Sequence, residues 1–278
     1  MTGRESSFDP VRMADLDRIM ELVRAVAWPH RREDIAQFIR LGGGRIARDE
    51  KGGRALATGL WWTFDDTLAR IGLVIVAPEA QGRGIGRRLV ETLLEDVSPR
   101  PIVLLATEAG LPLYEKLGFA AFDRSVQYQG TYTGDPIQDP RISRVAAGAI
   151  EEIAEIDAAA FGALRGDMLR DLAETGSVAV LTENGQISGY AMARAFGRGT
   201  VIGPLVAATE DDALALFRTL ARPGFVRIDC PADASTLIEY LQTAGLEDVG
   251  ASPVMVRGGW TPPSGPARIF GLASHALG

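Results

Sequence analysis

Cysteine, histidine and long apolar stretches are scarce in this chain of 278 residues. The single cysteine, Cys230, cannot form a disulfide within the chain and has no second thiol with which to build a CxxC redox or zinc motif. The two histidines, His30 and His275, stand at opposite ends of the sequence, so no histidine-rich metal cluster is expected. These scarcities exclude disulfide-stapled and zinc-finger classes, and we predict no metal site.

Basic residues are also outnumbered, which gives the chain a formal net charge of −7. This balance argues against a protein dedicated to binding nucleic acid. No apolar run reaches the roughly 18 residues of a transmembrane helix, and charges and Pro10 interrupt the N-terminal stretch where a signal peptide would be apolar. We therefore expect a cytoplasmic monomer or homodimer with no nucleic-acid or membrane partner.

The residues that are present suit one large or two small globular domains, since 46% are apolar and 23% are charged. The first half shows helical spacing over residues 13–27 and 33–41, then three strand-like segments that predict an antiparallel meander over 45–76. A glycine-rich turn then leads from a strand into a helix whose apolar stripe begins at Ile85. A strand over 102–106, a short helix over 111–117 and a last strand over 120–132 follow.

The same order of elements begins again after a turn-rich stretch. The segment starting at Ile71 is similar to that starting at Ile202, at an offset of 131, and Leu117-Gly118-Phe119 is similar to Ala244-Gly245-Leu246, at an offset of 127. These similarities, in register with the repeated element order, predict a duplication. We therefore predict a catalytic domain over 1–134, a linker over 135–142 and a degenerate domain over 143–278.

The glycine-rich turn carries the chemical signal of the sequence. Glycines let backbone amides approach phosphate oxygens without a Cβ in the way, and a helix N-terminus adds a partial positive charge. Arg83, Arg87 and Arg88 make this segment basic within an acidic protein. The pattern differs from a Walker P-loop, which needs GxxxxGK, and from a dinucleotide fingerprint, which follows a first strand in a βαβ unit. The turn therefore predicts a pyrophosphate site of another type.

Two segments of the first half resemble the GCN5-related N-acetyltransferase (GNAT) superfamily. Residues 71–89, IGLVIVAPEAQGRGIGRRL, are similar to its pyrophosphate loop, and residues 113–119, LYEKLGF, to its short tyrosine-bearing helix. The resemblance implies an α+β fold of two tandem GNAT-like domains, each a mixed, mostly antiparallel sheet flanked by helices. It also implies transfer of an acetyl group from acetyl-CoA to a primary amine of a small molecule, by direct attack in a ternary complex.

The resemblance assigns roles by position. The backbones of Val74 and Val76 would pair with the pantetheine arm of the co-substrate, as a strand edge pairs with an extended ligand. The pyrophosphate would bind the loop formed by Gln81, Gly82, Arg83, Gly84, Ile85, Gly86 and Arg87. Where the family often has an asparagine seven residues before the tyrosine, this chain has Thr107.

Tyr114 falls where the family places the general acid that protonates the leaving thiolate. Glu79 and His30 are candidates for the general base, and a water chain without a single base is an alternative. Trp28, His30 and Trp62 are candidates to line the acceptor pocket.

The second half resembles the family's element order without its signature. Gln81 corresponds to Asp212, Gly84 to Ala215 and Tyr114 to Leu241, so the second domain is predicted not to bind CoA. Two other functions fit the same loop: a non-catalytic CoA-binding sensor or regulatory module, and an acyltransferase that uses a longer acyl-CoA.

Overall fold

The computed structural model describes residues 7–49, 52–145 and 150–278. The first half of the chain forms β1 (Phe8–Pro10), η1 (Met13–Asp15), α1 (Leu16–Ala25), α2 (Arg32–Leu41), β2 (Gly43–Arg48), β3 (Ala55–Phe64), β4 (Leu68–Val76), η2 (Pro78–Ala80), α3 (Ile85–Val97), β5 (Ile102–Leu105), α4 (Leu111–Lys116) and β6 (Ala120–Tyr132). The second half forms β7 (Ile142–Val145), α5 (Ile150–Phe161), α6 (Gly166–Glu174), β8 (Gly176–Glu183), β9 (Gln186–Phe196), β10 (Gly199–Ala207), α7 (Glu210–Leu220), β11 (Gly224–Pro231), α8 (Ser235–Thr243), β12 (Leu246–Arg257) and β13 (Arg268–Gly271). Strand β7 begins at Ile142, inside the predicted linker.

The helices form where the apolar spacing predicts them. Helix α1 buries Leu16, Ile19 and Val23 along one face, and α3 buries Leu89 and Leu93 in the same manner. These stripes pack against the sheet, and α3 contacts β2, β3 and β4. The helix that carries the glycine turn is therefore anchored to the strand that precedes the turn.

The predicted meander is also present, because β2, β3 and β4 pair antiparallel in sequence order. The β3–β4 register shifts between Thr58 and Leu60, opposite a β4 residue, Leu73, whose φ is +51°. A positive φ is unfavourable for a residue with a branched side chain. Leu73 therefore marks a bulge that is held by its surroundings.

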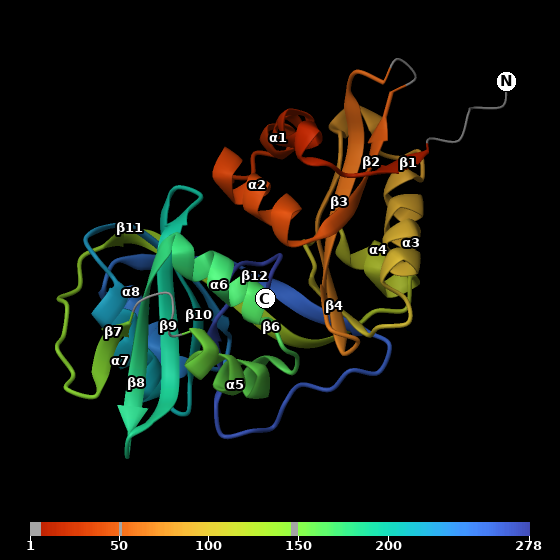
Figure 1. Ribbon diagram of the computed structural model, residues 1–278. Coiled ribbons are helices and arrows are strands. Elements are labelled where there is room, and N and C mark those ends of the chain that lie inside the picture. The colour runs from red at the N-terminus through yellow and green to blue at the C-terminus, as the bar shows by residue number, and fades with distance from the viewer. Residues whose placement is uncertain (1–6, 50–51, 146–149) are drawn as a thin grey trace, which may run out of the picture.

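The described strands form one continuous thirteen-stranded mixed sheet, in the order β1-β2-β3-β4-β5-β12-β6-β11-β10-β9-β8-β7, with β13 added on β10. The predicted α+β architecture, a mixed sheet flanked by helices, is confirmed. The last strands of the two halves are exchanged: β12 pairs with β5, and β6 pairs with β11. The two exchanged strands also pair with each other, so they lie between the halves (Figure 1).

The exchange explains how two sheets become one. If each half kept its own last strand, β5 and β11 would each end a separate sheet, and each would depend on that strand to cover its edge. The exchanged arrangement gives each strand its partner from the other half. Every hydrogen bond that joins β5 to β12, or β6 to β11, therefore also joins the two halves of the chain.

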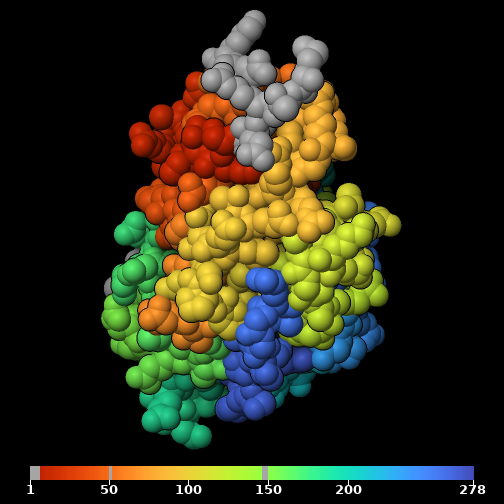
Figure 2. Space-filling view, turned by 90° about the vertical axis from the view of Figure 1, so that its right-hand side faces the viewer, coloured from red at the N-terminus to blue at the C-terminus, as the bar shows by residue number. Residues whose placement is uncertain are grey.

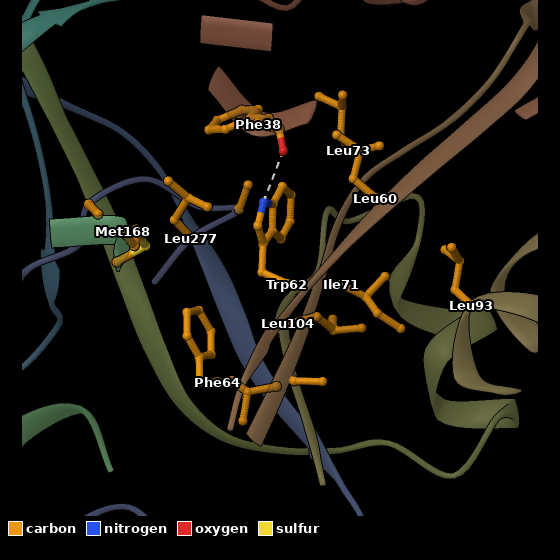
Figure 3. Packing of buried hydrophobic residues seen from close by; sticks show 14 of the residues in the cluster. Phe38, Leu60, Trp62, Phe64, Ile71, Leu73, Leu93, Leu104, Met168 and Leu277 are labelled. Atoms are coloured by element: carbon orange, nitrogen blue, oxygen red, sulfur yellow. Dashed lines mark hydrogen bonds between the residues drawn. The ribbon is translucent and has the colours of Figure 1, made fainter. Parts of the chain in front are cut away.

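One hydrophobic core crosses the boundary between the halves. Trp62 of β3 is fully buried, donates a hydrogen bond from Nε1 to the Phe38 carbonyl at 3.2 Å, and packs near Met168 and Leu277 from the second half (Figure 3). The Phe64 and Phe161 rings meet edge to face at 5.0 Å. Figure 2 shows blue residues of the C-terminal part lying against yellow residues of the first half. Across the described residues, no helix is long and apolar enough to cross a membrane.

Candidate active site

The parallel pair β4–β5 opens into a groove. The two strands pair at Ala69–Ile102 and at Arg70–Val103 and then separate, so beyond Arg70 the β5-facing edge of β4 has no strand partner in the described part of the chain. Val74 and Val76, both half-buried, lie on this open stretch. An unpaired strand edge offers amide and carbonyl groups to an extended ligand.

The glycine loop lies at the end of β4. Gly82 and Gly84 have φ values of +74° and +72°, a conformation that favours glycine, and Gly84 is the residue directly before α3. A Cβ at either position would meet no atom within 4 Å, so the space in front of the loop is open. Gln81 donates a hydrogen bond from Nε2 to the Val76 carbonyl at 3.1 Å, which ties the loop to the strand.

The charge of the loop is positive and largely uncompensated. Arg87 pairs with Glu91 at 2.8 Å on the exposed face of α3, whereas Arg83 and Arg88 make no ion pair with any carboxylate in the described ranges. Thus the loop offers two guanidinium groups, open glycine amides and the N-terminus of a 13-residue helix. These groups fit a pyrophosphate.

A cavity of about 360 Å³ lies at the other end of the groove. Gly72 and Leu73 of β4, Leu105 at the end of β5 and Thr107 just after it form one wall. The remaining lining comes from the loop after α1, from β6 and from the second half: Trp28, Pro29, His30, Gln127, Gln129, Phe196, Arg198, Arg227, Val249, Ser252, His275 and Ala276. Strand β4 therefore connects the cavity to the glycine loop, and both halves of the chain enclose the cavity.

Of the three residues expected to line the acceptor pocket, two lie at the cavity and one does not. Trp28 and His30 line the cavity, while Trp62 lies in the core and is not among the lining residues. Aromatic rings of Trp28, Phe38 and Phe196 surround His30 at 5.4–6.1 Å. Burial lowers the pKa of His30 to about 4, against an opposing effect of Asp34. The imidazole is therefore neutral at pH 7.

Tyr114 and Glu79 occupy different surroundings. Tyr114 of α4 is buried, its ring meets Phe119 at 5.7 Å, and burial raises its pKa to about 12, so the hydroxyl keeps its proton. The ring packs closely against Gly110, in the turn that follows Thr107: a Cβ added at Gly110 would lie 3.0 Å from Cε2 of Tyr114. Glu79 is half exposed, forms an ion pair with Arg54 at 2.6 Å and does not line the cavity.

The second half has the corresponding divergence of two parallel strands, but there a strand of the chain itself occupies the open edge. Strands β10 and β11 pair at Thr200–Val226 and Val201–Arg227 and then diverge, as β4 and β5 do. At this point β13 pairs with Leu205, Val206 and Ala207 of β10. By the 131-residue offset, Leu205 and Ala207 correspond to Val74 and Val76. The chain's own strand therefore occupies the edge that is open in the first half.

The loop region of the second half is also unsuited to an anion. Helix α7 begins with Glu210, Asp211 and Asp212, and the Thr209 side chain accepts a hydrogen bond from the Asp212 amide at its first turn. Arg141 holds the Asp212 carboxylate at 2.9 Å. Acidic groups stabilise a helix N-terminus but repel a pyrophosphate.

Sequence reasoning did not identify several lining residues. Gln127 and Gln129 are two apart on β6 and so face the same side of the sheet, a period-2 polar pattern that is visible in the sequence. His275 has no such local signal, since it reaches the cavity by the folding of the C-terminal segment over β4. Cys230 is fully buried, and burial raises the pKa of its thiol to about 12, so it is a structural cysteine.

Comparison with known proteins identifies both halves. Residues 42–121 and residues 153–271 each match a family described as an acetyltransferase (GNAT) domain. The uncharacterized N-acetyltransferase YitH of Bacillus subtilis is 30% identical over 219 residues, which cover 76% of this chain and 77% of that protein. A mycothiol acetyltransferase of Tsukamurella paurometabola is 40% identical over 101 residues, 33% of this chain and 34% of that protein.

Solved structures share the fold over the whole chain. A crystal structure of a Pyrococcus horikoshii protein superposes with a TM-score of 0.82 at 23% identity and covers 100% of this chain and 98% of that chain. A tandem GNAT protein from the clavulanic acid biosynthesis pathway superposes with a TM-score of 0.64 at 16% identity, covering 92% of this chain and 100% of that one.

Proposed function

The chain belongs to the GNAT acetyltransferases and is an acyl-CoA N-acyltransferase, and on this premise we propose that it transfers an acetyl group from acetyl-CoA to a primary amine of a small molecule. The observation that carries the proposal is the continuity of β4, whose open edge joins the glycine loop to the cavity. When bound, acetyl-CoA supplies an activated thioester. Gln81, Gly82, Arg83, Gly84, Ile85, Gly86 and Arg87 would hold its pyrophosphate, and Val74 and Val76 its pantetheine arm.

The two partners meet where the groove opens into the cavity. Binding both together replaces a bimolecular encounter by attack within one complex. Tyr114, which stays protonated because of its burial, is the proposed donor of a proton to the departing sulfur. It is kept close to the groove by the turn from Thr107 to Gly110, where the Gly110 amide donates to Thr107 Oγ1 at 3.2 Å.

The cavity lining favours one kind of acceptor. The titratable side chains among the described lining residues are two arginines and two histidines, without a carboxylate, and Gln127, Gln129, Thr107 and Ser252 add neutral hydrogen-bonding groups. This wall suits an amine that also carries hydroxyl or carboxylate groups, and it does not suit a polycation such as a polyamine. The acidic net charge of the chain therefore does not describe this cavity.

Release of free CoA from acetyl-CoA tests the proposal directly. We expect an amino acid or an amino sugar to support turnover, and polyamines to support much less. Tyr114→Phe should lower kcat by about 10–100-fold while the affinity for acetyl-CoA in calorimetry stays the same, because the lost proton donor acts in the transition state. If acetyl-CoA binds and no amine in the panel releases CoA, the chain is a CoA-binding sensor and not an enzyme of this kind.

A further inference from the structure

The two histidines of the chain, distant in sequence, meet at one cavity. His30 and His275 both line it, and they are close enough for a positive charge on His275 to contribute to lowering the pKa of His30. His275 is about one-third exposed, whereas His30 is buried among aromatic rings. The histidine that was not identified as a candidate from the sequence is therefore the more accessible of the two.

His275 faces a fixed carboxylate. Its Nε2 atom lies 3.2 Å from Oδ1 of Asp229, which is fully buried at the end of β11. The approach angle is outside hydrogen-bond geometry, but contacts between catalytic groups commonly tighten when substrate binds. Arg227 holds the same carboxylate with two nitrogens, the closer at 2.8 Å. Burial alone would raise the pKa of Asp229, but His275 and Arg227 lower it to about 2, so the carboxylate is charged at pH 7.

Buried arginines fix the segment that carries His275. Arg70 of β4 donates to the carbonyls of Ala276 and His275 at 3.3 and 3.4 Å, and Arg194 of β9 donates to the carbonyl of Ala273 at 2.6 Å. Arg165 donates to the Gly278 carbonyl at 2.8 Å.

All three guanidinium groups are nearly inaccessible to water, and burying a charge is costly unless it is hydrogen-bonded, so their hydrogen bonds to these carbonyls are kept. Gly72 of β4 also lets the C-terminal segment pack closely against the strand, since a Cβ at Gly72 would lie only 3.1 Å from the Cα of Ala276. The imidazole is thereby held beside the bulge of β4.

His30 is poorly suited to act as a base at neutral pH. Burial lowers its pKa to about 4, and its buried Nδ1 has no hydrogen-bond partner among the described residues. A base with so low a pKa is too weak to remove a proton from an ammonium group efficiently at pH 7. The arrangement around His275 is different, because a charged carboxylate stands beside its Nε2 and its Nδ1 makes no hydrogen bond within the described ranges. A carboxylate in this position orients an imidazole and stabilises its protonated form.

We propose that His275 is the general base of the acetyl transfer and that Asp229 is its positioning residue. The proton of the acceptor ammonium moves to Nδ1 of His275, and the freed electron pair of the nitrogen forms a bond to the acetyl carbonyl carbon. As this bond forms, the π pair of the carbonyl moves onto its oxygen, and it returns when the carbon–sulfur bond breaks and that bond's electron pair leaves with the sulfur of CoA. The sulfur takes a proton from Tyr114, and the second proton of the attacking nitrogen, released as the amide forms, returns to the tyrosinate. The proposal rests on the proposed function, since it assigns the base for that reaction.

Several charged groups face His275 from the surrounding elements. They come from β4, from the loop after α1, from β11 and from the β9–β10 turn, and they are Arg70, His30, Arg227, Asp229 and Arg198. Asp229 is the acidic group among them. Replacing it by asparagine removes the negative charge that would stabilise the imidazole as it takes up the proton of the acceptor.

His275→Gln tests the role of the base in the full-length enzyme. With the amine that the wild type turns over best, kcat should fall by about 10²–10⁴-fold. The Kd for acetyl-CoA in calorimetry should stay unchanged, and added imidazole should restore part of the activity of His275→Ala. Wild-type turnover tests the proposed function by itself, so equal kcat values for wild type and H275Q would overturn the histidine assignment alone.

Asp229→Asn tests the positioning role with the same acceptor amine. Folded D229N should lose kcat while the KM for the amine and the Kd for acetyl-CoA stay at the wild-type values, because the carboxylate that orients the imidazole and stabilises its protonated form in the transition state is lost. A folded D229N with the kcat of the wild type would overturn the positioning role of Asp229.

Discussion

At the scale of single residues, His30 links the stability of the fold to pH. In the unfolded chain an imidazole takes up a proton near pH 6.5, whereas burial lowers the pKa of His30 in the folded protein to about 4. Between these values the unfolded state binds more protons than the folded state. The free energy of unfolding therefore decreases as the pH falls from 6.5 to 4, by up to about 3 kcal/mol from this residue.

Urea unfolding at several pH values checks this expectation with His30→Leu as the comparison. The wild-type free energy of unfolding should drop more steeply than that of the variant between pH 6.5 and 4, because other groups titrate equally in both proteins. The difference between the two curves should grow to about 3 kcal/mol at the acid end. Parallel curves would mean that His30 is not buried as a neutral group.

The same residue shows why the site could be predicted only in part. His30 and Trp28 lie in a loop after a helix, and their place beside the cavity follows from a family resemblance in that local segment. His275 and Asp229 meet through the return of the C-terminal segment across β4. No spacing in the sequence encodes that contact, because it depends on three arginines that belong to other elements.

At the scale of elements, the glycine loop before α3 controls binding of the co-substrate. Gly84→Glu should weaken acetyl-CoA binding by about 100-fold or more, because a carboxylate would face the pyrophosphate and two charge-assisted hydrogen bonds are worth roughly 3 kcal/mol. Calorimetry with acetyl-CoA measures this loss directly. Gly84 has a φ of +72°, so part of any loss of stability comes from backbone strain alone.

Gly185→Glu is the matched control for that strain. Gly185 lies in the β8–β9 turn with a φ of +78°, and a Cβ there also meets no atom within 4 Å. Both variants should lose similar stability in thermal unfolding, while the affinity of G185E for acetyl-CoA stays at the wild-type value. A G84E protein that binds acetyl-CoA as tightly as G185E would refute the assignment of the loop.

The elements themselves were predictable where periodicity is strong. The meander of β2, β3 and β4 and the helices α1 and α3 each follow from a run of apolar residues with one clear period. Strands β1 and β7 were missed because each is too short to show a period. The sequence also predicted a last strand for each half, but the partner of β6 could not be derived, since an alternating strand fits either β5 or β11 equally well.

At the scale of the whole molecule, the exchanged strands make the halves depend on each other. Strand β6 pairs with β11 from Ser125 to Tyr132, and β12 pairs with β5 from Val254 to Arg257. A first half alone would leave β6 without either of its partners and β5 with β4 alone, and it would expose the core around Trp62. The duplication seen in the sequence therefore produces one cooperative unit.

Cutting the chain between the halves tests this dependence. Residues 133–139 form no helix or strand, so a protease site placed there should be cleaved in the folded protein. We expect the two fragments to stay together in size-exclusion chromatography and to keep the acetyl-CoA affinity of the uncut enzyme, because the ladders that join the halves do not involve this segment.

Separate production of the same two segments completes the test. Residues 1–134 or 135–278 made alone should be insoluble or unfolded by circular dichroism, and co-production with a tag on one should recover both. The reason is that β6 and β12 each complete the sheet of the other half, so each segment alone has exposed strand edges and apolar core residues. Two segments that fold and bind independently would show instead that each last strand pairs within its own half.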